Sequence, residues 1–339
     1  MATAKNGKPH YVGVDDGHWG IKIYTEDGRM LTLPSRARSG RHVISISEND
    51  DSDFYSLEDG STFTVNPYLP QFEDTRFKEY PKSGLNAVLV HHALYQAGFG
   101  GQNVAIETGL PVAHYYLADG AKDQVLIDAK RSSLKRLVTR GGGQPLANIV
   151  QAGVTTEAIA AYIDLLIDDD GNPSEHAEEL QRSTSGFIDI GGRTTDSVVL
   201  LPGQQVVTER SGSSDVGVLQ LNEAVASKLR TKFDLDQVPP IMVEKAIREG
   251  IVRISGKDEP VGEMVRAEKE KLADQIMAAV RVKIGSGKDL EFVEFVGGGA
   301  IVMRDQLANY FPHARFPDHP EYANARGMMK IAKFIKGGA

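Results

Sequence analysis

The sequence predicts an α/β protein built from two similar halves, and three segments carry this prediction. VGVDDGHWGIK (residues 12–22) and FIDIGGRTTDSVVL (residues 187–200) each read as an apolar strand ending in Asp, a turn with Gly, and a second apolar strand. VGGGA (residues 296–300) follows a later apolar strand. Glycine in such turns lets backbone N–H groups approach a phosphate without a Cβ in the way. We therefore expect one phosphate-binding turn in each half.

The first half alternates strands and helices. Asp27-Gly28 and Asp59-Gly60 are hairpin-turn signals, and the polar segment 36–81 is expected to form a small inserted lobe. Gly98 is expected to close a helix, and Thr155 to cap another. In order, the predicted strands are 11–14, 21–25, 30–33, 104–107 and 147–151, and the predicted helices are 85–97, 121–138 and 156–167.

The second half repeats the strand–turn–strand pattern of the first. The polar run 168–185, with Gly171 and Pro173, separates the halves. After the strands of 187–200, helices are predicted over 216–229 and 260–284, with a shorter one opening at Pro239-Pro240. A buried strand at 292–296 and a closing helix at 325–334 complete the chain.

Composition is that of an ordinary globular protein expected in the cytoplasm. The 339 residues are 41% hydrophobic, which suffices for two cores. The net charge of −8 argues against direct nucleic-acid binding, and the absence of cysteine excludes disulfides and thiolate chemistry. No apolar run is long enough for a membrane span, and residues 1–10 are expected to be a short disordered tail.

The motifs resemble those of ParM/StbA, the bacterial actin-like plasmid-segregation ATPases of the actin, sugar-kinase and DnaK superfamily. The resemblance runs from about Tyr11 to Phe334 and is thin over residues 36–81 and 241–291. The motifs that carry it, in ParM order, are DDGxxxIK (15–22), VHHAL (90–94), LPxxxYY (110–116), DIGGxTxD (189–196), SSxxGV (213–218) and YANARGM (322–328).

This resemblance implies an actin-like ATPase fold: two RNase H-like domains around a nucleotide cleft, each with a smaller inserted subdomain. Domain I would span residues 1–167, with an insert at about 34–82. Domain II would span 185–322, with a helical insert at about 216–288. Residues 323–339 would form a C-terminal helix that returns to domain I.

The resemblance also implies a site for ATP, or GTP, with Mg²⁺. Asp15 and Asp189 would hold the water shell of the metal; the alternative for Asp15 is that it caps the turn together with Asp16. Lys22 would contact phosphate; the alternative is an exposed lysine on the strand. Glu223 and Lys245 would roof the nucleotide or be exposed helical charges. The remaining expected contacts are Asp16, Gly17, His18, Trp19, Gly20, Gly191, Gly192, Arg193, Thr194, Asp196, Gly297, Gly298 and Gly299.

Three positions depart from the ParM pattern. His18 and Trp19 stand where ParM has hydroxyl side chains, so backbone amides of residues 17–20 would have to bind the phosphate. His18 is expected to donate a hydrogen bond and not to act as a base. Arg193 replaces a small residue and is expected to lean toward solvent, while Asp196 would order either the turn or the metal's water.

The candidate catalytic residues are Glu157, Gln151 and the metal-associated Asp189. Glu157 fits the ParM pattern VxxExI at residues 154–159, and Gln151 is the rival because actin uses Gln in the corresponding hinge. A carboxylate in a first helical turn also stabilises the helix dipole, which is the alternative for Glu157. His91 and His92 are expected to be hydrogen-bonded within domain I and not to bind metal.

By resemblance, the chain would polymerise with nucleotide, depolymerise after hydrolysis and segregate plasmid DNA. Its partners would be itself and a ParR-like adaptor on the plasmid centromere, with DNA contacted only indirectly and no membrane. The alternatives are a sugar- or acetate-type kinase and a DnaK-like nucleotide switch that does not polymerise.

Overall fold

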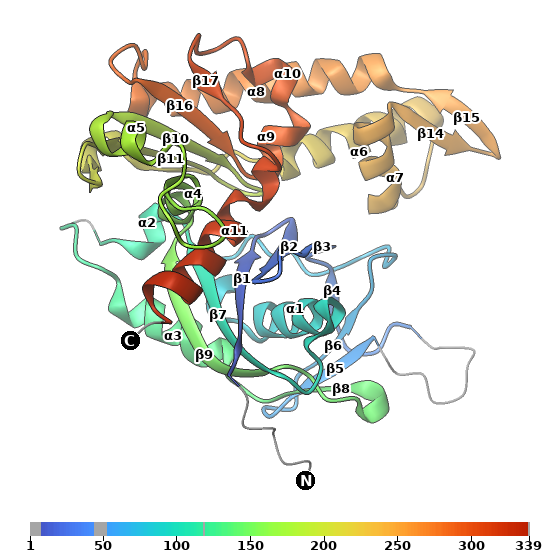
Figure 1. Ribbon diagram of the computed structural model, residues 1–339. Helices are drawn as coiled ribbons and strands as arrows, with labels where there is room; N and C mark the ends of the chain where they lie inside the picture. The colour runs from blue at the N-terminus through green and yellow to red at the C-terminus, as the bar shows by residue number, and fades with distance from the viewer. Residues whose placement is uncertain (1–7, 44–52, 118, 338–339) are drawn as a thin grey trace. The chain divides into compact units, whose positions relative to one another are not determined.

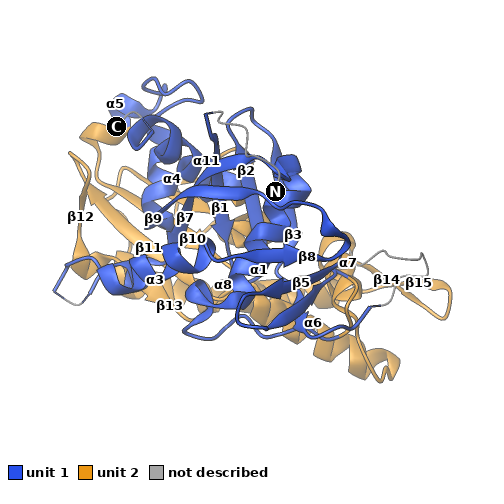
Figure 2. Ribbon diagram, turned by 90° about the horizontal axis from the view of Figure 1, so that it is seen from below, with its two compact units in different colours: residues 1–67, 71–179, 322–339 blue, residues 68–70, 180–321 orange. Residues whose placement is uncertain are grey.

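The computed structural model describes residues 8–43, 53–117 and 119–337. The chain forms two compact units (Figure 2). Unit 1 comprises residues 1–67, 71–179 and 322–339, and unit 2 comprises residues 68–70 and 180–321. The N-terminal segment 1–7 and part of the predicted inserted lobe, residues 44–52, lie outside the described residues.

Unit 1 is organised around a five-stranded sheet (Figure 1). The first three strands form an antiparallel meander, and the last two run parallel to β1. The strand order is β3 (Met30–Pro34), β2 (Gly20–Thr25), β1 (His10–Asp16), β7 (Asn103–Leu110) and β9 (Asn148–Thr156).

Helices cover both faces of this sheet. Helices α1 (Gly84–Leu94) and α3 (Gln124–Leu134) pack against the face that carries Val12 and Val14. Helices α4 (Glu157–Leu166) and α11 (Ala323–Lys330) pack together on the other face. Because side chains alternate along a strand, Asp16 belongs to the α1 face and Asp15 to the α11 face.

The C-terminal helix α11 fits closely into unit 1. A Cβ on Gly13 would lie 1.8 Å from the Ala325 carbonyl oxygen, and one on Gly327 would lie 1.8 Å from the Ala160 carbonyl oxygen. Arg326 also donates from Nε and Nη2 to the Asp164 carboxylate, at 2.7 and 2.6 Å. Two glycines and a bidentate ion pair thus hold α11 against β1 and α4.

A smaller four-stranded sheet is inserted in unit 1, in the order β4 (Ala37–Ser39), β6 (Thr62–Val65), β5 (Phe54–Leu57), β8 (Val138–Arg140). The predicted turn at Asp59-Gly60 joins β5 to β6, with Gly60 at φ 83°. Strand β8 lies where a helix was predicted to continue to residue 138. The helix ends at Leu134 because Val138 and Thr139 pair with β5, which favours β-branched side chains.

Unit 2 repeats the sheet pattern of unit 1. Its strand order is β12 (Gln205–Val206), β11 (Thr195–Leu201), β10 (Ser185–Ile190), β16 (Phe292–Val296) and β17 (Ala314–Arg315), and β13 (Gly212–Ser214) also pairs with β11. Again the early strands are antiparallel and the last two are parallel to the strand that carries the aspartate. The duplicated topology confirms the predicted α/β fold class.

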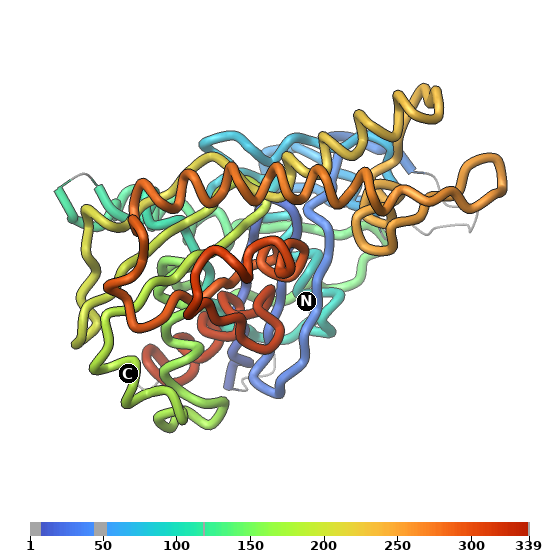
Figure 3. Tube along the Cα trace, turned by 90° about the horizontal axis from the view of Figure 1, so that it is seen from above, coloured from blue at the N-terminus to red at the C-terminus, as the bar shows by residue number. Residues whose placement is uncertain are grey.

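The longest helix of unit 2 is α8 (Gly262–Ile284), which packs on β11 and on α6 (Leu219–Phe233) (Figure 3). The hairpin of β14 (Ile251–Ile254) and β15 (Lys257–Pro260) precedes α8 and follows α7 (Pro240–Glu249). This hairpin was missed, although Ser255-Gly256, both at positive φ, is a recognisable turn pair.

Shorter elements connect the layers. They are helices α2 (Val112–Tyr115), α5 (Ala177–Arg182), α9 (Gly298–Val302) and α10 (Arg304–Leu307), the 3₁₀ turns Tyr80–Lys82, Gly141–Gly143, Thr208–Arg210 and Pro320–Tyr322, and the π-helical turns Tyr95–Phe99 and Ile331–Ile335. Among the described residues, no helix combines the length and apolar character that a membrane span needs.

Candidate functional site

The first glycine-bearing turn, residues 17–19, connects β1 to β2 as predicted. Its carbonyl oxygens are bound by unit 1: Ser35 donates from its hydroxyl to Gly17 (2.7 Å) and from its amide to Trp19 (3.1 Å). The Thr75 hydroxyl donates to the His18 carbonyl at 2.9 Å. The carbonyls are thereby held toward the protein, which suits an anion site because a carbonyl oxygen repels phosphate. Ser35 and Thr75 were not predicted, because neither lies in a recognisable motif.

The His18 side chain is engaged in a hydrogen bond that does not suit a general base. Its Nδ1 lies 2.9 Å from the Thr75 carbonyl oxygen, which can only accept, so the imidazole donates as expected. Its ring also packs 4.9 Å from that of Tyr80. His18 therefore fastens the turn to the segment around Thr75, and the half-buried Trp19 remains beside it in the same turn.

Asp15 and Lys22 form a buried ion pair across the hairpin. They are directly opposed in the β1–β2 register, and Lys22 Nζ donates to Asp15 Oδ2 at 2.6 Å. Because side chains alternate along each strand, both residues lie on the α11 face of the sheet. The exposed-lysine alternative is wrong, since the Lys22 side chain is only 9% exposed. A phosphate role for Lys22 stays a prediction.

Asp16 is held inside unit 1. Lys130 on α3 donates to it at 2.9 Å, Asn86 on α1 donates at 2.8 Å, and the Thr108 hydroxyl donates as well. With both carboxylate oxygens accepting from side chains of its own unit, Asp16 positions the turn, and a contact of Asp16 with nucleotide stays a prediction. Lys130 gives no local sequence signal, because its partner lies 114 positions away.

The second turn, residues 191–194, connects β10 to β11. The Gly191 amide donates to the Thr194 carbonyl (2.9 Å), and the start of α6 is fastened to the turn by Val218 and Leu219 amides bonded to the Gly191 and Gly192 carbonyls. A Cβ on Gly217 would lie 2.5 Å from the Gly192 carbonyl oxygen. Here too the carbonyls are turned into the unit, and a helix begins beside the turn.

Asp189 and Asp196 occupy the positions in unit 2 that Asp15 and Lys22 occupy in unit 1. They are directly opposed in the β10–β11 register and lie on one face of the sheet. Like charges directly opposed are destabilising unless compensated. Asp196 accepts from the Thr194 hydroxyl at 3.1 Å and from the Ser213 hydroxyl, so it orders the turn. A pair of buried carboxylates also suits a hard cation with oxygen ligands.

Arg193 forms an ion pair beside the turn. Its guanidinium lies 3.3 Å from the carboxylate of Asp215, and the side chain is 25% exposed. The expectation that it leans outward is consistent with this ion pair at the exposed Asp215.

The glycine run after β16 lies against the end of β10. Gly297, at φ 87°, leaves no room for a side chain, because a Cβ would lie 2.1 Å from Asp189 Oδ1. A Cβ on Gly299 would lie 2.2 Å from Ile190 Cγ2. Gly298 begins α9 between them. The run thus brings backbone directly against the carboxylate of Asp189, next to the second turn and within one unit.

Of the three candidate catalytic residues, Gln151 and Glu157 belong to unit 1, where they lie at different positions along the strands of its main sheet. Through the parallel ladders, Gln151 is level with Tyr11, four residues and about 13 Å before Asp15. Glu157 follows the end of β9 and opens α4, and a Cβ on Gly109 would lie 2.7 Å from its Cγ. Glu157 is therefore at the same edge of the sheet as Asp15, and exposed Gln151 is not. The N-cap of α4 is Thr156, one residue later than predicted, because β9 continues through it.

The two helical candidates for nucleotide contacts, Glu223 and Lys245, lie on α6 and α7. Glu223 is exposed on α6, and Lys245 lies 3.9 Å from Glu249, one turn away on α7. For both residues the nucleotide role and the role of a surface charge stay predictions.

The buried histidines of α1 are hydrogen-bonded within unit 1, as expected. His91 Nε2 bonds the Leu134 carbonyl at 3.1 Å, and His92 Nδ1 bonds the Tyr55 hydroxyl at 2.7 Å. Burial lowers the pKa of each imidazole to about 4, so both are neutral at pH 7. Within the described part of the chain, no group of three or more His, Cys, Asp or Glu side chains could hold a metal ion. Mg²⁺ needs only one or two carboxylates beside water and phosphate.

Comparison with protein-family models agrees with this duplicated architecture. Residues 11–167 match the family described as "Plasmid segregation protein ParM, N-terminal", and residues 187–309 match "Archaeal actin homologue MreB-like, C-terminal". The chain has an actin-like fold. Its first half matches a ParM model, as the motifs predicted, and its second half matches a model named for archaeal homologues. A comparison with curated protein sequences found no match.

Solved structures of actin homologues superpose on nearly the whole chain. A 15-stranded ParM filament from Clostridium botulinum matches with TM-score 0.73 and 18% identity, covering 96% of this chain and 99% of that one. Ta0583, an archaeal actin homologue in complex with ADP, matches with TM-score 0.74 and 22% identity over 95% and 98%. The actin-like protein Alp7A matches with TM-score 0.74 and 16% identity over 96% of both. These likenesses confirm the actin-like fold.

Proposed function

We propose that this actin-like protein binds ATP or GTP with Mg²⁺, hydrolyses it, and forms filaments that segregate plasmid DNA. The observation that carries the nucleotide part is the pairing of two equivalent turns, each following a strand that presents a buried aspartate and each with its carbonyls bound by its own unit. Turns of this kind offer backbone amides to phosphate oxygens. The ADP in the Ta0583 complex supports a nucleotide as the ligand.

Asp15 and Asp189 are the residues that would hold Mg²⁺. Both side chains are buried, and both belong to strand ends next to a glycine-bearing turn. The metal would neutralise charge on the phosphates when bound. The ammonium of Lys22, already at the Asp15 carboxylate, is a point charge suited to phosphate. Gly297 would let backbone approach the nucleotide near Asp189, and Glu157 would orient the attacking water from the edge of the unit 1 sheet.

The filament part rests on the family. The ParM N-terminal model and the solved ParM filament support self-association as the use of the nucleotide. A head-to-tail contact that does not close into a ring gives an open filament. The net charge of −8 supports contact with plasmid DNA through a ParR-like adaptor and not directly.

Nucleotide affinity tests the two turns. Asp15→Ala and Asp189→Ala should each weaken binding of a fluorescent ATP analogue in the presence of Mg²⁺, and the difference from the native chain should shrink in EDTA. Glu270→Ala, which removes an exposed carboxylate from α8 of unit 2, is the control and should bind normally. Native Mg²⁺-dependent affinity in both test variants would refute the assignment.

A further inference from the structure

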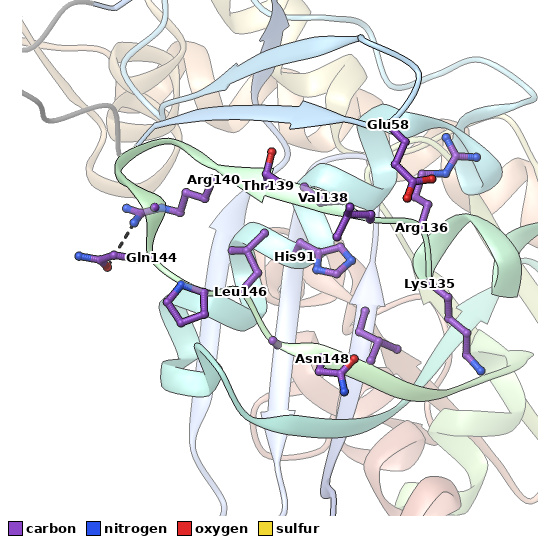
Figure 4. A pocket seen from close by; sticks show the side chains of 15 residues that line it. Glu58, His91, Lys135, Arg136, Val138, Thr139, Arg140, Gln144, Leu146 and Asn148 are labelled. Atoms are coloured by element: carbon purple, nitrogen blue, oxygen red, sulfur yellow. Dashed lines mark hydrogen bonds between the residues drawn. The ribbon is translucent and has the colours of Figure 1, made fainter. Parts of the chain in front are cut away.

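A cavity of about 610 Å³ lies in unit 1, away from the turns described above (Figure 4). It is lined by the connection from α3 to β9, together with His91 from α1 and Glu58 from the inserted sheet's hairpin. Its volume falls in the range of small-molecule sites. The family resemblance and the proposed function leave this cavity without a role.

The cavity carries an excess of positive charge. Lys135, Arg136 and Arg140 line it, against the single carboxylate of Glu58. Among the residues that the structure describes, none of the three cations forms an ion pair. In a chain of net charge −8, a cavity lined by three cations and one carboxylate favours an anionic ligand.

Hydrogen-bonding groups accompany these charges. His91 is 5% exposed and bonds the Leu134 carbonyl through Nε2, which must therefore carry the ring's proton. This leaves Nδ1 as an acceptor, and it has no hydrogen-bond partner in the described structure. Figure 4 shows the His91 ring between Val138 and Leu146, with Lys135 and Arg136 on one side.

The opposite side of the cavity is formed by Arg140 and Gln144. The Arg140 guanidinium lies over the Tyr95 ring at 4.2 Å and donates to Gln144 Oε1 at 3.4 Å. Its buried Nε has no partner among the described residues. The amide side chain of Asn148, at the start of β9, completes the polar lining, with its nitrogen donating to Asn103 Oδ1 at 2.8 Å. Amides and a neutral imidazole acceptor suit hydroxyl groups, whereas the cations suit phosphate.

We propose that this cavity binds a small phosphorylated polyol, such as a sugar phosphate, with the phosphate at Lys135 and the hydroxyl groups toward the His91 side of the cavity. Such a ligand would touch β8, which belongs to the inserted sheet, and Asn148 of β9, which belongs to the main sheet. It would therefore brace the inserted sheet against the main one and stabilise unit 1 by binding the folded state.

Isothermal titration with ribose 5-phosphate, ribose and inorganic phosphate tests this site. Ribose 5-phosphate should bind saturably and raise the unfolding temperature, and each of the other two should bind at least tenfold more weakly. The double variant Lys135→Ala/Arg136→Ala should lose at least tenfold in affinity. Lys271→Ala, which removes an exposed lysine from α8, should bind like the native chain.

Asp15→Ala separates this proposal from that of the nucleotide site. It should leave the affinity for ribose 5-phosphate unchanged, and a loss there would place the ligand at the nucleotide turns and overturn the inference. Absence of saturable binding, native affinity in the double variant, or equal affinity for inorganic phosphate would each overturn it as well. Binding of oligonucleotides with no binding of ribose 5-phosphate would show a different kind of surface.

Discussion

The buried Lys130–Asp16 pair makes a quantitative prediction about the support of the first turn. Lys130 is 2% exposed and lies 2.9 Å from Asp16 Oδ1 and 2.6 Å from the Gly109 carbonyl oxygen. Lys130→Met keeps much of the side chain's length and apolar surface but leaves the Asp16 carboxylate buried without its counter-charge. Removing one partner of a buried pair costs about 3–5 kcal/mol. At about 2–4 °C per kcal/mol, unit 1 should unfold roughly 6–20 °C earlier.

Trp19 supplies the assay. It is the only tryptophan, and it lies in the turn that Asp16 supports, so its fluorescence reports the unfolding of unit 1. Lys82→Met, which removes a half-exposed lysine in the same unit, is the control and should leave the midpoint unchanged. The double variant Asp16→Asn/Lys130→Met removes both charges and should recover much of the loss. A loss below about 1 kcal/mol in Lys130→Met would refute the reasoning, since such values are typical of exposed pairs.

Three further predictions concern hydrolysis, the glycine run and acid stability. Glu157→Ala should bind ATP almost normally but hydrolyse it about 100-fold more slowly, whereas Gln151→Ala should hydrolyse normally; the reverse result in single-turnover assays would assign the role to Gln151. Gly297→Ala should weaken nucleotide binding, because its Cβ would meet Asp189, while Gly203→Ala, at a similar φ but with nothing within 4 Å, should not; equal binding by both would contradict the close approach. Burial lowers the pKa of His91 and His92 to about 4 in the folded protein. As the pH falls below about 6.5, these histidines therefore take up protons in the unfolded chain before they do so in the folded one. The free energy of unfolding should decrease between about pH 6.5 and pH 4. His92→Gln should make that slope shallower by up to about 1.4 kcal/mol per pH unit in urea unfolding, and an unchanged slope would show that His92 titrates normally.

Much of the fold could be predicted because its signals are local. The two strand–turn–strand segments, the strand at 292–296 and the Asp59-Gly60 turn all depend on alternation or on turn residues within a few positions. The boundary of α3 could not be predicted, because Val138 and Thr139 are drawn into β8 by pairing with β5, some 80 positions earlier. Strand β7 likewise continues through Thr108-Gly109, since neighbours on both sides extend its ladder.

The candidate site likewise contains residues that local motifs predict and residues that only the fold brings together. Asp15, Asp189 and the glycines follow from their motifs, but the groups that hold the turns come from distant segments. Ser35 and Thr75 bind the carbonyls of the first turn, and Lys130 binds Asp16, and no spacing in the sequence links them. Side chains alternate between the two faces of a strand, but this alternation could place Lys22 on a particular face only once the β1–β2 register was known.

Sedimentation with Mg²⁺ and ATP or GTP tests the central claim most directly. The account predicts a pellet above a critical protein concentration that requires nucleotide and metal, and that disappears as the nucleotide is consumed. In Glu157→Ala the polymer should persist longer, because loss of the terminal phosphate is what weakens the filament. Only monomer well above micromolar protein with either nucleotide, unchanged by an adaptor and its DNA, would contradict the account.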